Sequence, residues 1–158
     1  MTDIDVDPPF DPQVIPGAKS VITRFCENPL SGRVEWLEAK VTPEFLQTGS
    51  AVSKEVEEYV FEGDTRKGDS VHMIVPQSLG GDGDATYNVF PMGRSFDRGT
   101  FQNETESMVY HFVKDSGTSA LLRIKLLYKN ADTVRPYKLL YVVELENGDT
   151  IENELMNV

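Results

Sequence analysis

The chain has 158 residues, and 39% of them are hydrophobic, which is enough for one domain with its own core. Its 26 Asp and Glu residues outnumber 15 Lys and Arg, so the net charge is −11. That sign excludes a module that holds nucleic acid tightly through its overall charge. It does not exclude phosphodiester chemistry, because a metal ion supplies local positive charge at a phosphate.

The start of the chain carries no basic segment followed by an apolar run. We therefore expect no cleavable leader, and a protein that is cytoplasmic or exported without such a leader. No stretch approaches the roughly 18 apolar residues of a membrane helix, so we expect no membrane partner. The single cysteine, Cys26, has no partner for an internal disulfide and is typical of a small buried hydrophobe.

Composition divides the chain near Gly32. Residues 1–31 are interpreted as an acidic, proline-rich lead-in, extended or flexible over residues 1–17. Residues 32–158 are interpreted as the folded domain. The alternation in Arg33–Val41 predicts a half-buried strand, and Val56–Phe61 is interpreted as a second strand.

Two loops and a short apolar run follow. Residues 63–70 are loop by composition, and Val71–Pro76 is an apolar run that contains one histidine. The glycines of Gly80–Asp84 disfavour both helix and strand, which predicts a plain connecting loop.

The second half of the chain predicts one helix and three strands. Thr100–Lys114 has the apolar spacing of a helix. Ala120–Tyr128 and Tyr137–Leu145 predict strands, and Asn147-Gly148 predicts a hairpin turn into Thr150–Leu155. Because the strands are joined by short turns and only one main helix is present, the sequence predicts an α+β domain built on an antiparallel sheet.

The chain contains two histidines. His111 falls in the predicted helix beside Tyr110 and Phe112, and we interpret it as a surface or packing residue. His72 lies next to a polar loop, inside an apolar run. A single histidine there is typical of a structural role. The alternative is a general base, since its unperturbed pKa of about 6.5 suits proton transfer near neutral pH.

Three short segments, taken together, resemble the sites of the DNA/RNA non-specific endonuclease family, which is of the ββα-metal (His-Me finger) type. They are Asp69-Ser70-Val71-His72, Asn88-Val89-Phe90-Pro91-Met92 and Asp97-Arg98-Gly99-Thr100-Phe101. The family's counterparts read Asp-Arg-Gly-His, Asn-x-x-Pro-Gln and Asn-x-Gly-x-aromatic, followed by a glutamate on the helix. The spacing between the second and third segments matches the family without insertion. With Leu79-Gly80-Gly81, Arg135-Pro136 and the final Asn157, the resemblance covers about residues 32–158.

The resemblance implies a role for each matched residue. His72 would be the general base, and Asn88 would orient the site or the phosphate. Asp97 would take the position of the metal-binding asparagine, while Arg94 and Arg98 are the nearest cations for a phosphate. The implied cofactor is Mg²⁺ (or Mn²⁺), and Mg²⁺ prefers oxygen ligands and keeps several waters.

The chain departs from the family pattern at several positions. Ser70 and Val71 replace the arginine and glycine before the histidine, and Met92 replaces the glutamine. A carboxylate at Asp97 is able to bind Mg²⁺ but adds negative charge near a substrate. Taken alone, Asp97 is also typical of a helix N-cap, and Asn88 is typical of a loop residue that bonds to backbone.

The helical glutamate has two candidates. Strict spacing from Asp97 places Thr105 at its position, with Glu104 and Glu106 on either side. A slip of one residue restores Glu106. Both glutamates therefore stay open as metal-site candidates.

Two functions follow from these observations. The first is a hydrolase, namely a metal-dependent endonuclease that cleaves DNA or RNA with little base preference and contacts the backbone phosphates. The alternative is a catalytically weakened nuclease-like domain that acts as a regulatory module, because an acidic surface suits a basic protein partner. The sequence favours neither DNA nor RNA and leaves open the oligomeric state and membership of a larger toxin or effector.

Overall fold

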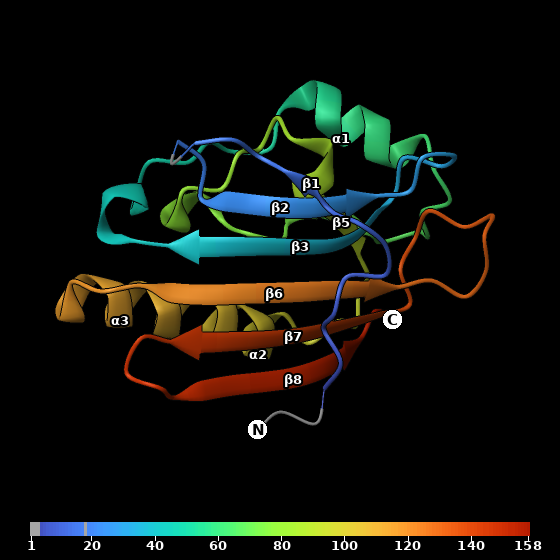
Figure 1. Cartoon of the computed structure of the whole chain (residues 1–158). Helices are drawn as coiled ribbons and strands as arrows, with labels where there is room; N and C mark the ends of the chain where they lie inside the picture. The colour runs from blue at the N-terminus through green and yellow to red at the C-terminus, as the bar shows by residue number, and fades with distance from the viewer. Residues whose placement is uncertain (1–3, 18) are drawn as a thin grey trace.

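A computed structural model describes residues 4–17 and 19–158. Its main feature is a six-stranded antiparallel sheet with the order β1-β2-β3-β6-β7-β8 (Figure 1). The strands are β1 (Gln13–Val14), β2 (Ile22–Glu27), β3 (Val34–Val41), β6 (Ala120–Leu127), β7 (Lys138–Leu145) and β8 (Thr150–Met156). No helix in the described part of the chain is long and apolar enough to cross a membrane.

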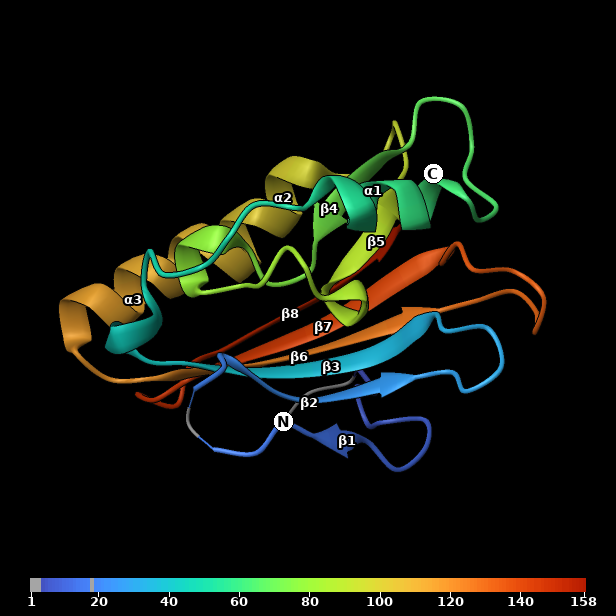
Figure 2. The ribbon, with the colours of Figure 1, turned by 90° about the horizontal axis from the view of Figure 1, so that it is seen from above.

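A second layer covers one face of this sheet (Figure 2). It holds a two-stranded antiparallel sheet and three helices, with 3₁₀ turns between them. The elements are α1 (Lys54–Phe61), β4 (Ser70–Met73), β5 (Val89–Met92), α2 (Arg98–Gln102) and α3 (Met108–Ser116). A π-helical turn, Asn103–Ser107, joins α2 to α3. The predicted α+β class is confirmed, and β4, β5 and the helix after them form a ββα arrangement.

The core lies between the two layers. In β6 the residues alternate between buried and half-buried, and Leu122, Ile124 and Leu126 face the core. Above them, Phe90 of β5 and Phe101 of α2 pack edge to face, and Phe101 does the same with Tyr141 of β7 at a ring distance of 5.7 Å. Apolar burial of this kind is the main stabilising contribution in folding. It fixes the ββα layer on the sheet.

The prediction of a strand over Val56–Phe61 is wrong, because these residues belong to helix α1. The side chain of Ser53 accepts a hydrogen bond from the Val56 N–H at 3.2 Å and caps the helix. Glu55 and Glu57 lie in the first turn, where the helix dipole favours carboxylates. The N-cap serine was the sequence signal that distinguishes the helix from a strand.

Residues 1–31 contribute two strands to the sheet, so this segment is more than a lead-in. β2 pairs with β3 and β1 pairs with β2. Before them, the chain crosses the face of the sheet that the helices leave open (Figure 2). There the carbonyl of Val6 accepts a hydrogen bond from Trp36 Nε1 at 2.6 Å, and the buried Cys26 thiol donates to the Phe10 carbonyl. The sheet therefore begins before Gly32.

Glu38 of β3 is a buried carboxylate held by cations from both neighbouring strands. It accepts hydrogen bonds from Arg24 at 2.8 Å and from Arg123 at 3.0 Å, and a third from Thr23. Burial alone would raise the pKa of Glu38, but the hydrogen bonds from Arg24, Thr23 and Arg123 outweigh it and lower the pKa to about 2. Because the folded pKa is depressed, the stabilisation is complete above the ordinary value of 4.5 and is lost as pH falls toward 2.

We expect Glu38→Gln to lower the free energy of unfolding at pH 7 by about 1–3 kcal/mol, because hydrogen bonds to a charged group are lost. Urea unfolding at pH 7 and near pH 2.5 measures it, and the deficit should shrink at the lower pH. Glu144→Gln is the matched control, since the exposed Glu144 lies 3.8 Å from Arg123. An equal deficit for Glu38→Gln at both pH values would contradict the assigned pKa.

Candidate active site

His72 is presented by the ββα arrangement. It lies on β4 opposite Phe90 of β5, and its side chain borders a cavity of about 100 Å³ between β4, β5 and the helix. Met92, Phe101, Gln102, Thr105 and Glu106 also line this cavity. Since the apolar core packs β5 against α2, the histidine is held at the boundary between core and solvent.

The hydrogen bonding of His72 determines its protonation. Arg98 Nη2 lies 3.1 Å from His72 Nε2, and a guanidinium only donates, so Nε2 is the acceptor and the ring is neutral. Burial lowers the pKa of His72, and the nearby Arg98 charge lowers it further. The imidazole is therefore a competent proton acceptor at neutral pH. Arg98 is bonded to the nitrogen that a base would use.

We expect Arg98→Ala to raise the pKa of His72 toward its ordinary value of 6.5, because a positive charge is removed and water gains access to the ring. A pH titration of the histidine Cε1–H resonances by NMR measures the change, and His72→Ala assigns the signal. Arg94→Ala is the control, since this second exposed arginine is not bonded to His72. If the two arginine variants leave the pKa equally unchanged, the Arg98 contact has no electrostatic effect on His72.

Asn88 is fully buried at the start of β5. Its Oδ1 accepts from the Val75 N–H at 2.8 Å, and its Nδ2 donates to the carbonyls of Val75 at 3.0 Å and Asp82 at 3.3 Å. Asn88 is not among the residues that line the His72 cavity. These bonds tie the segment after β4 to the start of β5, so Asn88 positions the strand that carries His72.

Asp97 caps helix α2 at the surface. Its two oxygens accept hydrogen bonds from the hydroxyl of Thr100 at 2.8 Å and from its backbone N–H at 3.1 Å, and these bonds lower the pKa of Asp97. The expected N-cap geometry is therefore present. The same carboxylate is exposed, ionised and directly adjacent to Arg98.

The side chains that the structure describes form no closed metal site. In residues 4–17 and 19–158, no group of three or more His, Cys, Asp and Glu side chains is placed to hold a metal. A site closed by protein ligands is thus not supported. Mg²⁺ needs only one or two carboxylates and keeps several waters, and the exposed carboxylate of Asp97 fits that mode.

The two candidate glutamates point in different directions. Glu104 faces the sheet, where it accepts hydrogen bonds from Tyr141 at 2.5 Å and Asn153 at 3.1 Å. Glu106 borders the His72 cavity and accepts from the Ser78 hydroxyl at 2.5 Å. Both glutamates lie in the π-helical turn Asn103–Ser107, and residues two apart in a helix face nearly opposite sides. Thr105 between them is buried.

A buried ion pair anchors the start of β4. Arg135 donates to both oxygens of Asp69, at 2.8 and 2.9 Å, and the two side chains are 5% and 1% exposed. A third guanidinium nitrogen of Arg135 donates to the carbonyl of Asn157 at 3.0 Å. The pair thereby joins the loop before His72 to the segment before β7 and to the end of the chain. Both residues lie in segments that the sequence singled out, but their pairing is not visible in one sequence.

Arg94 lies farther from His72 than Arg98 does. It is exposed and is not among the residues that border the His72 cavity. Its side chain packs against Gly68, whose φ of +91° lies in the left-handed region, and a Cβ there would be 3.1 Å from Arg94 Nε. Arg94 is thus placed over the loop that precedes β4.

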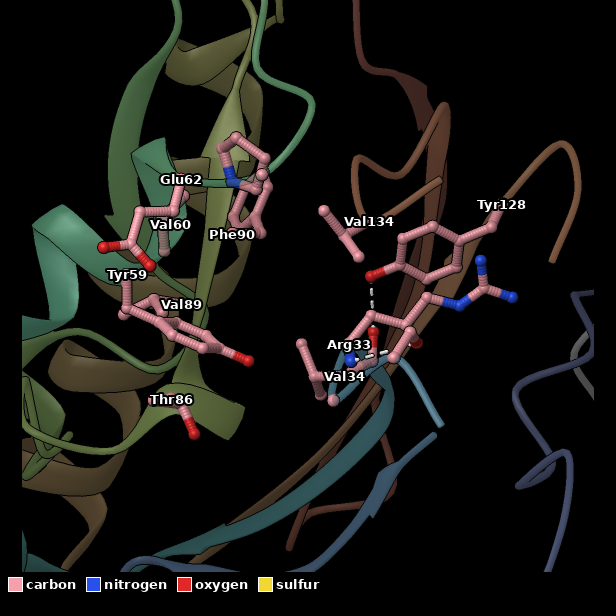
Figure 3. A pocket seen from close by; sticks show the side chains of 14 residues that line it. Arg33, Val34, Tyr59, Val60, Glu62, Thr86, Val89, Phe90, Tyr128 and Val134 are labelled. Atoms are coloured by element: carbon pink, nitrogen blue, oxygen red, sulfur yellow. Dashed lines mark hydrogen bonds between the residues drawn. The ribbon is translucent and has the colours of Figure 1, made fainter. Parts of the chain in front are cut away.

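A second cavity, of about 220 Å³, lies between α1, β5 and the β3 and β6–β7 end of the sheet (Figure 3). Its walls are mainly apolar, from Val34, Val89 and Val134, together with Tyr59 and Tyr128. The Tyr128 hydroxyl donates to the Val34 carbonyl at 2.6 Å. The lining residues of this cavity include no histidine, unlike those of the His72 cavity.

Comparisons with known proteins agree on the fold. No family model and no curated protein matches the sequence. The crystal structure of NucA from Streptococcus agalactiae with no metal bound aligns with a TM-score of 0.60 and 15% identity, over 99% of this chain and 76% of that one. The structure of the same protein with a magnesium ion bound aligns with a TM-score of 0.61 and 14% identity, over 99% and 77%. The chain therefore shares the fold of NucA.

Proposed function

We propose that this protein is a metal-dependent endonuclease that hydrolyses DNA or RNA phosphodiester bonds with little base preference. One observation carries the proposal: a neutral histidine, presented by a ββα arrangement, borders a cavity together with the carboxylate of Glu106 and is hydrogen-bonded to Arg98. The fold shared with NucA, a protein that has been crystallised with a magnesium ion, supports it.

In this proposal His72 Nε2 accepts the proton of the water that attacks phosphorus. In the structure, which contains no substrate, Arg98 donates a hydrogen bond to that nitrogen. A phosphate is a stronger, charged partner for a guanidinium than a neutral imidazole is. Substrate binding would therefore draw Arg98 to the phosphate oxygens and free Nε2 for water, so the base is exposed only when a phosphate is present.

Asp97 would hold the divalent ion, whose chemistry is to stabilise negative charge on the phosphate and the departing oxygen. Glu106, and not Glu104, is the helical carboxylate that borders the His72 cavity. The groups proposed to act are two carboxylates, an arginine and a histidine. Because arginine and carboxylate-bound metal address phosphates, they carry no base information, which agrees with a nuclease of low sequence preference.

We expect Asp97→Asn to raise the Mg²⁺ concentration needed for half-maximal cleavage of plasmid DNA, because a carboxamide binds the ion more weakly than a carboxylate does. Asparagine is an equally good N-cap, so the melting temperature should stay unchanged. Asp84→Asn, at an exposed aspartate of the loop Gly80–Asp84, is the matched control. The same Mg²⁺ dependence in both variants and the wild type would remove Asp97 from the metal site.

A further inference from the structure

Basic side chains that form no ion pair gather at one end of this acidic molecule. Arg98 is at His72, and Arg94 packs against Gly68. Arg66 and Lys67 directly precede that glycine, and Lys129 lines the same cleft as Arg66. In the part of the chain that the structure describes, none of these five side chains lies within ion-pair distance of a carboxylate. They form a track that leads away from His72.

The far end of this track is a polar cleft of about 240 Å³ between residues 63–69 and the β6–β7 loop. Arg66 and Lys129 bring positive charge to it, and Asn130, Thr133 and Tyr137 bring polar groups. Backbone amides, hydroxyls and cations are the usual partners of phosphate oxygens. The lining is thus chemically suited to an anion.

One carboxylate, Asp64, lines the cleft together with Arg135, and a second, Asp69, lies next to it, but both carboxylates are already hydrogen-bonded. Asp64 accepts hydrogen bonds from the Thr133 hydroxyl and from the Val134 N–H, and these bonds hold the two loops together. Asp69 is buried against Arg135. The pairings leave Arg66 and Lys129 as the cations that face the cleft without a carboxylate partner, on two loops that are fixed relative to each other.

We propose that this cleft is a second phosphate subsite, which binds a backbone phosphate of the polynucleotide whose scissile phosphate lies at His72. The inference rests on the proposed nuclease function. It indicates that the polynucleotide runs from His72 toward this cleft. Arg94 packs against Gly68 of the loop that runs from the cleft to β4, where it would contact the intervening backbone. The net charge of −11 repels a polyanion. A local basic track would attract the phosphates of a polynucleotide in spite of that net charge.

The test measures the binding of DNA in EDTA, which removes the divalent metal and so prevents cleavage. A fluorescent DNA duplex is titrated with the wild-type protein and with the double variant Arg66→Gln/Lys129→Gln. The titrations are done in EDTA at several NaCl concentrations. We expect about tenfold weaker binding, and a salt slope reduced by about 1, because the subsite takes one phosphate and each phosphate contact contributes about 0.9 to that slope. Lys40→Gln/Lys54→Gln is the control, since it makes the same charge change on β3 and α1. The conservative Arg66→Lys/Lys129→Arg variant should bind as the wild type does.

An equal loss of affinity in both Gln double variants, or no loss in either, would overturn the subsite. A third arm uses inorganic phosphate, which should shift the NMR signals of residues 64–69 and 129–133 if the cleft takes phosphate as such. The result is separable from the nuclease proposal. Binding that depends on Arg66 and Lys129 without any cleavage would keep the subsite and reject the catalysis, whereas cleavage that depends on His72 with normal binding by the double variant would do the reverse.

Discussion

Replacing His72 with alanine is expected to lower the single-turnover rate of DNA cleavage by about 10²–10⁴-fold, the usual contribution of a general base. The side chain is half-buried, borders the cavity together with Glu106 and is hydrogen-bonded to Arg98. Its removal leaves Arg98 in place for the phosphate but no group to take the proton from water. Binding of the DNA duplex in EDTA should therefore change far less than the rate.

His111→Ala is the matched control for this result. His111 is exposed on α3, where its ring packs edge to face on Tyr110 at 5.6 Å. We expect its loss to leave both the cleavage rate and the melting temperature close to those of the wild type. Metal-dependent cleavage that survives in His72→Ala at the rate of His111→Ala would assign the base elsewhere.

The second large effect concerns stability. We expect Asp69→Asn to lower the free energy of unfolding by about 3–5 kcal/mol, because it leaves the guanidinium of Arg135 buried without a counter-charge. The side chains of the pair are 1% and 5% exposed. Since the pair anchors the loop before β4, we also expect His72 to lose its position, so cleavage should fall even where the protein is still folded.

Urea unfolding measures this loss, with Glu154→Gln as the control. Glu154 is an exposed carboxylate 3.8 Å from Lys138, and exposed pairs contribute only about 0–1 kcal/mol. Both substitutions exchange a carboxylate for a carboxamide, so the difference between them isolates burial. A loss in Asp69→Asn no larger than that in Glu154→Gln would show that the anchor is not needed for stability.

The sequence predicts the parts of the fold where periodicity is clear. β3, the helix, β6, β7 and β8 are confirmed because each has one face on the core, as the alternation of Leu122, Ile124 and Leu126 shows. β1 and β2 were missed. In β2 the buried residues Ile22, Phe25 and Cys26 do not alternate with exposed ones, and its register with β3 shifts at two points. A strand without alternation gives no period of two to detect.

For the candidate site, the sequence singled out His72, Asn88 and Asp97. In the structure Asp97 caps α2, and the next residue, Arg98, contacts His72. Asn88 instead bonds to backbone. The sequence did not predict that Arg98 is bonded to His72, because that contact depends on the packing of α2 against β4. It also left Glu104 and Glu106 open. The contacts of the two side chains distinguish them, because Glu104 is bonded to Tyr141 and Asn153 of the sheet and Glu106 borders the His72 cavity. Such contacts between distant segments cannot be read from one sequence.

The measurement that tests the nuclease proposal most directly is cleavage of supercoiled plasmid DNA by the folded wild-type protein at about pH 8, with Mg²⁺ or Mn²⁺ and with an EDTA control. At that pH His72 is neutral, since its pKa lies below the ordinary value. We predict nicking that requires the divalent ion and stops in EDTA. No cleavage by folded protein in any divalent metal would contradict the proposal and would favour a domain that keeps the nuclease fold without its chemistry.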